Sequence, residues 1–102
     1  MTRAQLVKKI NKQICGLAPG FYSDNFWAGE RIVSKELHCI EGLQVTLNNA
    51  RYDNDDKGTP IAKRWIYDVT DGQRNCYVII IASGAGTVSD PLSRYDIVSY
   101  AY

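Results

Sequence analysis

His38 is the only histidine in the chain, and with the three cysteines it supplies the residue types used in nucleophilic and metal chemistry. An imidazole can activate a thiol that the fold brings beside it, so His38 with Cys15 or Cys76 is a candidate nucleophilic pair. Cys39 adjoins His38 and, on a strand, would point to the opposite face. One histidine and three scattered cysteines are also poorly spaced for a metal site. We therefore expect a partly buried, structural His38, with no metal and no cofactor.

The carboxylates nearest to His38 in the sequence are Glu30, Glu36 and Glu41. Together with Arg31 or Arg64 they provide the groups that a small ribonuclease uses as acid, base and phosphate clamp. Nothing in their spacing fixes a catalytic geometry, so the sequence favours a protein that is not an enzyme.

Two segments resemble ligand-binding loops only in part. Residues 53–58 begin like a calcium loop, but its fifth and twelfth positions, which must supply oxygen ligands, hold Lys57 and Arg64. Gly84 and Gly86 follow an apolar run, but the third glycine and the helix of a dinucleotide-binding fingerprint are missing. We expect a solvated turn in the first segment and a turn or bulge in the second.

Basic and aromatic residues suggest one alternative function. Lys8, Lys9 and Lys12 fall on one side of a predicted helix, and such a basic face can follow a phosphate backbone. Exposed aromatic side chains can stack bases. The candidates for stacking are Tyr52, Trp65, Tyr67, Tyr77, Tyr95, Tyr100 and Tyr102. The formal net charge of +1 is low for a nucleic-acid-binding domain, so binding of single strands is kept as an alternative prediction.

The composition is that of an ordinary globular domain. Of 102 residues, 45% are hydrophobic and 23% are charged, so we expect one domain spanning residues 1–102. An odd number of cysteines favours free thiols in a reducing compartment, although one bridge from Cys39 to Cys15 or Cys76 stays open. Residues 1–17 carry no apolar signal-peptide core, and no apolar run is long enough to cross a membrane. We expect a cytoplasmic protein without a membrane partner.

The first half of the chain predicts one clear helix. Thr2 and Gln5 form a capping box, and Leu6, Ile10 and Ile14 follow on one side of a helix over residues 3–15. Proline, glycine and polar residues predict an irregular connection over 18–29. Residues 30–41 fit either a short helix or an irregular strand.

The second half predicts strands. Residues 43–48 alternate apolar and polar side chains, and residues 95–102 form a last strand rich in β-formers. Residues 61–70 and 73–82 predict a hairpin with a type I′ turn at Asp71-Gly72, which pairs Thr70 with Gln73 and sets Trp65 opposite Val78. The fold class is therefore α+β: an N-terminal amphipathic helix packed on an antiparallel sheet of about four strands.

The predicted hairpin has two unlike faces. The first face, which we expect beneath the helix, carries Ile61, Trp65, Tyr67, Val69, Cys76, Val78 and Ile80. The second face carries Arg64, Ile66, Asp68, Asn75, Tyr77, Ile79 and Ile81. It is too apolar for free water, so either residues 18–41 or another chain should cover it.

The leading prediction is a non-enzymatic accessory protein that self-associates as a homodimer through this second face. Its interface candidates are Arg64, Ile66, Asp68, Tyr77, Ile79 and Ile81. A further alternative is a ligand-binding or enzymatic pocket between helix and sheet. Its candidates are Trp27, His38, Trp65 and Tyr67, with His38 or Asp68 as the polar group at the pocket floor. If the last strand lies at an edge of the sheet, it is a further contact surface.

Overall fold

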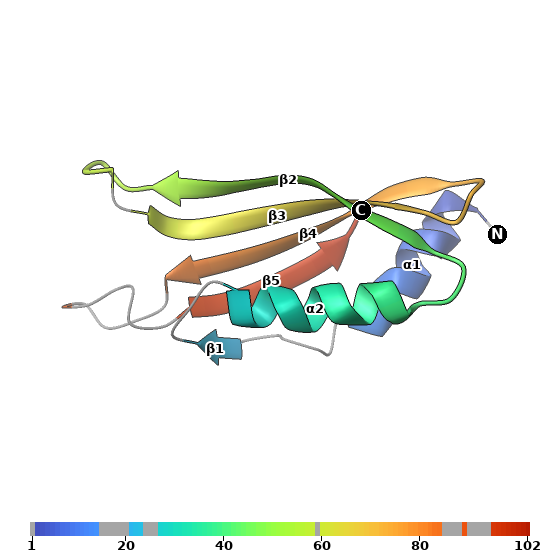
Figure 1. The fold of residues 1–102 in the computed structure, drawn as a ribbon, viewed down its shortest axis with the longest axis horizontal. Helices are drawn as coiled ribbons and strands as arrows, with labels where there is room; N and C mark the ends of the chain where they lie inside the picture. Colours follow the sequence, from blue (N-terminus) through green and yellow to red (C-terminus); the bar gives the residue numbers. More distant parts are fainter. Residues whose placement is uncertain (1, 15–20, 24–26, 59, 85–88, 90–94) are drawn as a thin grey trace.

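The computed structural model describes residues 2–14, 21–23, 27–58, 60–84, 89 and 95–102. It contains two helices and one five-stranded sheet (Figure 1). In chain order the elements are α1 (Arg3–Ile14), β1 (Phe21–Ser23), α2 (Trp27–Cys39), β2 (Gln44–Asn54), β3 (Pro60–Thr70), β4 (Asn75–Gly84) and β5 (Tyr95–Ala101). The predicted α+β class, with an N-terminal helix on an antiparallel sheet, is confirmed.

Helix α1 begins where the capping box places it. The Gln5 backbone N–H donates to Thr2 Oγ1 at 3.2 Å, and the Thr2 N–H donates to Gln5 Oε1 at 2.7 Å. These bonds satisfy backbone groups that the first turn of a helix otherwise leaves unpaired. Leu6, Ile10 and Ile14 are fully buried, as their spacing predicts.

Residues 30–41, which fit either a helix or a strand, lie mostly in helix α2. Val33 and Leu37, one helical turn apart, are both buried against the sheet. The helix begins at Trp27, inside the stretch predicted to be irregular, and β1 lies in the same stretch. That prediction was therefore wrong for residues 21–23 and 27–29, while residues 18–20 and 24–26 lie outside the described chain.

The strand order is β1-β5-β4-β3-β2, and every neighbouring pair is antiparallel. The long strands β2 to β5 are the predicted ones, and β1 adds a three-residue fifth strand beside Tyr95–Ile97. The last strand, β5, therefore lies inside the sheet at this end and is not an edge along its whole length. The two edge strands are β1 and β2.

The β3–β4 hairpin exists, but its predicted register was wrong by two residues. Thr70 pairs with Asn75, and Trp65 with Ile80. Gly72 alone in this turn has a positive φ, of 95°, and the Asp71 N–H donates to the Arg74 carbonyl. A glycine at the first of two central residues is the pattern of a type II′ turn rather than type I′. Because the slip is an even number of residues, every side chain stays on its predicted face.

The Asp71 carboxylate stabilises this turn. Its Oδ1 accepts the backbone N–H groups of Arg74 at 2.6 Å and Gln73 at 2.9 Å. These two bonds lower the pKa of Asp71, and the bond from Arg74 has the larger effect. The turn is thus determined by an aspartate side chain that caps backbone donors, which an Asp-Gly dipeptide alone does not reveal.

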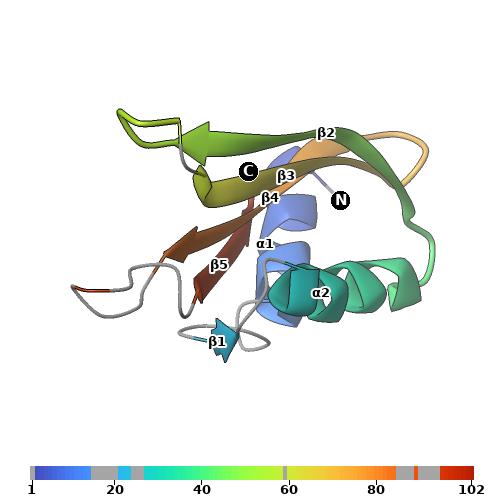
Figure 2. The ribbon, with the colours of Figure 1, turned by 60° about the vertical axis from the view of Figure 1, so that its left-hand side comes forward.

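Both helices pack on one face of the sheet, which curls over them (Figure 2). The core between them holds the predicted first-face residues Trp65, Tyr67, Val69, Cys76, Val78 and Ile80. Ile61 is the exception and is exposed, because the β2–β3 hairpin extends beyond the N-terminal end of α2 (Figure 1). Cys76 is a buried free thiol and Cys39 is an exposed one, while Cys15 lies outside the described residues.

Candidate interaction surface

The six predicted interface residues lie together on the sheet face opposite the helices. Antiparallel pairing of β4 with β5 adds three residues to this face: Tyr100 opposite Ile79, Val98 opposite Ile81, and Tyr102 opposite Tyr77. We call this set of nine residues the open face. It comprises Arg64, Ile66, Asp68, Tyr77, Ile79, Ile81, Val98, Tyr100 and Tyr102.

Aromatic and aliphatic side chains form the centre of the open face. Tyr77, Tyr100 and Tyr102 are 43%, 45% and 43% exposed, and Val98 is 48% exposed. The rings form a cluster, with centroids 5.6 Å apart between Tyr77 and Tyr102 and 5.9 Å between Tyr100 and Tyr102. Neighbouring exposed apolar groups of this kind mark interaction surfaces on soluble domains.

Residues 18–41 do not cover this face where the structure describes them. Strand β1 extends the sheet beside β5, and α2 packs against the opposite, helix-covered face. Of the two alternatives for what covers the open face, covering by residues 18–41 is therefore wrong for residues 21–23 and 27–41. The physical reason is that Val33 and Leu37 bury themselves in the same core as α1.

Charged residues flank the apolar centre and are already paired in part. Arg64 donates from Nε and Nη2 to the two carboxylate oxygens of Asp53, at 2.8 and 3.0 Å. This bidentate bond lowers the pKa of Asp53 and raises that of Arg64. Asn48 donates to Asp68 Oδ2 at 2.9 Å. Salt bridge and amide bond both fix the direction of charged side chains at the edge of the tyrosine cluster.

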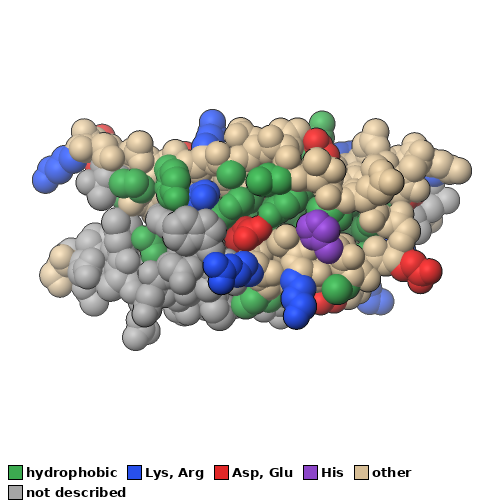
Figure 3. Space-filling view, viewed as in Figure 1, with side chains coloured by type: hydrophobic (Ala, Val, Ile, Leu, Met, Phe, Trp, Pro, Cys, Tyr) green, Lys and Arg blue, Asp and Glu red, His purple; other side chains and the backbone are tan. Residues whose placement is uncertain are grey.

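All six lysines and all three glutamates lie away from the open face. Three of the lysines are on α1; Glu30, Lys35 and Glu36 are on α2, with Glu41 just after it; Lys57 is in the β2–β3 connection. Lys63 is on β3, but its Nζ lies over the rings of Tyr52 and Trp65, on the other side of the sheet. Figure 3 shows the molecule from the side of α2, with basic, acidic and histidine side chains spread over it.

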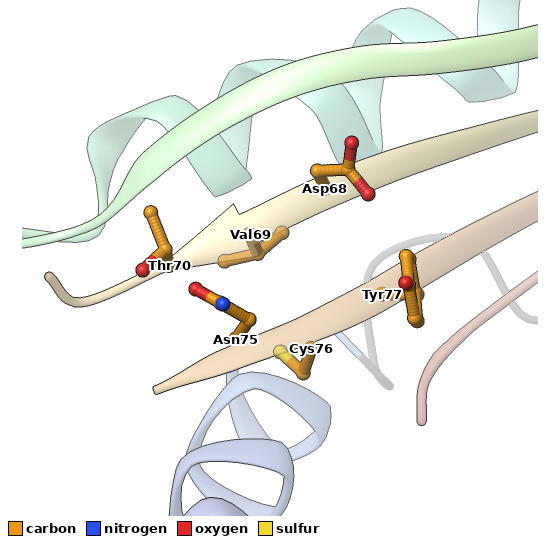
Figure 4. A pocket seen from close by; sticks show the side chains of 6 residues that line it. All are labelled: Asp68, Val69, Thr70, Asn75, Cys76 and Tyr77. Carbon is orange, nitrogen blue, oxygen red and sulfur yellow. The ribbon is translucent and has the colours of Figure 1, made fainter. Parts of the chain in front are cut away.

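A small cavity of about 280 Å³ lies at the hairpin end of the open face (Figure 4). It is lined by Asp68, Val69, Thr70, Asn75, Cys76 and Tyr77. Its volume is at the lower limit for binding a small molecule. Asp68, one of the two predicted floor residues, therefore borders a cavity on the open face and not a pocket beneath the helices.

Those pocket candidates whose side chains the structure describes do not come together between helix and sheet. Trp65 and Tyr67 are buried in the core, where the Tyr67 hydroxyl donates to Glu30 Oε1. Burial is the larger cause, and the bond to Glu30 the next, of a pKa that is raised to about 12 for Tyr67. His38 is exposed rather than partly buried, because it lies on the outer side of α2, where its Nδ1 bonds the Ser34 carbonyl at 2.7 Å. Trp27 begins α2, and its side chain lies outside the described set.

The structure also separates the two halves of the predicted nucleic-acid site. Lys8, Lys9 and Lys12 are exposed on the side of α1 that faces away from the sheet, since Leu6, Ile10 and Ile14 face it. Tyr77, Tyr100 and Tyr102 are on the opposite side of the sheet. Among the described residues there is no cluster of side chains able to hold a metal ion.

Comparison with known proteins adds no relative to this description. No family model, no curated protein and no solved structure gives a significant match to the chain. Neither helix that the structure describes is long and apolar enough to cross a membrane.

Proposed function

We propose that this protein is a self-associating interaction module that forms a homodimer through its open face. The observation that supports this most directly is the uncovered tyrosine cluster on a face free of lysine and glutamate. Tyrosine and arginine are enriched at the centres of protein interfaces, whereas lysine and glutamate are depleted there. A sheet that buries only one apolar face in its own core leaves the other for a partner.

The open face is complementary to a copy of itself. Ile66, Ile79 and Tyr100 form one row across three strands. In an isologous dimer the two-fold axis lies in the plane of contact, so residues displaced equally to either side of it meet. A two-fold axis along this row brings Arg64 of each copy opposite Asp68 of the other copy, so the pair occurs twice in the dimer. It also brings Tyr77 opposite Ile81, so that apolar residues meet apolar residues, with aligned sheet packing.

Substitution at the centre of this row tests the proposal. In Tyr100→Asp, two carboxylates meet on the axis without a basic partner, which we expect to weaken dimerisation about 100-fold, or ~3 kcal/mol. The matched control is Ile32→Asp, an apolar-to-acidic change at an exposed position of α2 on the other side of the molecule. Native mass spectrometry and sedimentation over a range of concentrations measure the dissociation constants.

A wild-type dimer that Tyr100→Asp separates and Ile32→Asp leaves intact supports the proposal. A wild-type monomer at every concentration, or equal dimerisation of both variants, contradicts it. Circular dichroism of both variants checks that the monomer fold is retained, which we expect because Tyr100 is about half exposed.

Binding of single-stranded nucleic acid is the second candidate, since three clustered tyrosines on an open sheet are the kind of platform on which bases stack. The position of the three lysines on the other side of the molecule weighs against it. A short oligonucleotide that binds, and loses affinity in Tyr100→Asp, would favour this candidate over the homodimer.

A further inference from the structure

The two edges of the sheet are protected to different degrees. At the β5 side, β1 pairs with Tyr95–Ile97. Further along the same edge, the Asn11 side chain donates from Nδ2 to the Ala101 carbonyl at 3.1 Å and accepts the Ala101 N–H at 2.7 Å. A helix side chain thus takes the place of a strand residue, and the backbone groups at both ends of this edge are satisfied.

Strand β2, at the other edge, has a neighbour on one side only. Ten of its eleven residues pair with β3, and no other described strand pairs with it. Its sequence contains neither lysine nor proline, the residues that commonly protect such an edge. Two register shifts, at Leu47/Asn49 and at Asp53/Asn54, interrupt its ladder with β3, and the five residues from Asn49 to Asp53 between them pair without interruption. Leu47 and Tyr52 are large and about half exposed. A long edge of this kind is a template for an additional strand.

The register shows which residues direct their backbone groups outward. In antiparallel ladders, successive residues point their N–H and C=O groups alternately to the two sides. Tyr77 exchanges both bonds with Tyr102 on β5, so Val78 directs its groups to Tyr67 on β3. Tyr67 directs its groups to β4, and Arg64 lies an odd number of residues before it, so Arg64 directs its groups to Arg51 on β2. The N–H and C=O of the next residue, Tyr52, therefore point out of the sheet.

The charges on either side of Tyr52 suit a second copy of β2. Arg51 and Asp53 lie on the same side of the strand, two residues apart and opposite in sign. An antiparallel partner that complements these charges carries an acidic residue opposite Arg51 and a basic residue opposite Asp53, whose carboxylate also accepts two bonds from Arg64 of its own chain. In the N- to C-terminal direction, the partner strand must then carry a basic residue, any residue and an acidic residue. Arg51-Tyr52-Asp53 has this order itself.

We infer that β2 pairs edge to edge with β2 of a second copy, antiparallel and centred on Tyr52. This contact places Tyr52 opposite its counterpart in a pair that exchanges two backbone hydrogen bonds, with Arg51 opposite Asp53 at both ends. It extends the sheet from five strands to ten. It uses backbone groups at the sheet edge and not the open face, so it does not depend on the proposed function.

Disulfide trapping at Tyr52 tests this register. In a Cys15→Ser, Cys39→Ser background, Tyr52→Cys places two thiols on the axis, with Cα atoms about 5.5 Å apart, within disulfide range. The matched control is Ala50→Cys, which is exposed on the same side of the same strand. In the inferred pairing its two copies lie roughly 13 Å apart, too far for a bond. Mild oxidation followed by intact mass measurement gives the dimer yield.

We expect a disulfide-linked dimer from Tyr52→Cys and little from Ala50→Cys. Adding Arg51→Asp should lower the yield about tenfold, because acidic residues then face each other at both ends. Equal yields at the two positions, or none at Tyr52→Cys, would overturn the inference. Adding Tyr100→Asp separates the two proposals: trapping that persists in this variant comes from the edge, whatever the state of the open face.

Discussion

Tyr67 shows how one buried hydroxyl joins helix α2 to the sheet. The hydroxyl donates to Glu30, so a core position that carries a polar atom is nevertheless satisfied. In Tyr67→Phe, the Glu30 carboxylate loses this donor while the ring still fills the core. We expect the free energy of unfolding at pH 7 to fall by about 1–2 kcal/mol. Urea denaturation measures it, and Tyr102→Phe, at an exposed tyrosine, should leave stability unchanged.

The same residue predicts a pH dependence. The pKa of Tyr67 is about 12 in the folded chain and 10 in the unfolded one, because burial first and Glu30 second disfavour the phenolate. The stabilisation is therefore complete below pH 10 and is lost as the pH rises from 10 to 12. The difference in unfolding free energy between wild type and Tyr67→Phe should narrow over this interval. A constant difference up to pH 12 would contradict the assignment.

Helix α2 is held against β5 by close packing at Gly29. A Cβ atom at this position would overlap three carbon atoms of the Ile97 side chain. In a helix interior, glycine to alanine normally stabilises by about 1 kcal/mol. Here we expect Gly29→Ala to destabilise by about 1–3 kcal/mol through overpacking, and thermal unfolding measures the sign. The double variant with Ile97→Ala, which makes room, should be less than additive; strict additivity would contradict this explanation.

Elements were predictable from sequence where local signals agreed. The capping box and the Leu6, Ile10, Ile14 spacing determine α1, and period-two alternation identifies the faces of β3 and β4. Strand β1 has three residues and exists only through its pairing with β5, so no local pattern could reveal it. The hairpin register depended on the Asp71 side chain, a choice that turn residues leave open.

The candidate surface was predictable for its inner strands and not for its outer part. Alternation in the hairpin placed Ile66 and Tyr77 on a common face without knowledge of the tertiary structure. Tyr100 and Tyr102 join them only because Tyr102 pairs with Tyr77, a contact between residues 25 positions apart that propensity does not specify. The location of α2 on the other side of the sheet, where it leaves the open face uncovered, is likewise determined by tertiary packing.

At the scale of the whole molecule, charge and apolar surface are segregated. The basic face of α1 and the tyrosine cluster lie on opposite sides of the sheet, so they do not form one continuous surface. We expect the dissociation constant of the proposed homodimer to change less than about threefold between roughly 0.1 and 1 M NaCl, because the centre of the proposed interface is apolar. Nucleic-acid binding would weaken by several orders of magnitude over that range. Sedimentation at the two salt concentrations distinguishes these behaviours.

The location of the lysines also determines how the protein can be attached to a surface. Every lysine amine lies on the helices, in the β2–β3 connection or on the helix-covered side of β3. Coupling through lysine amines therefore anchors the molecule by its helical side and leaves the tyrosine cluster facing the solution. Reagents that modify phenol rings do reach the tyrosine cluster, since Tyr77, Tyr100 and Tyr102 are accessible, and they also reach Tyr52 on the other side of the sheet. The choice of coupling chemistry thus decides whether an immobilised chain can still receive a partner.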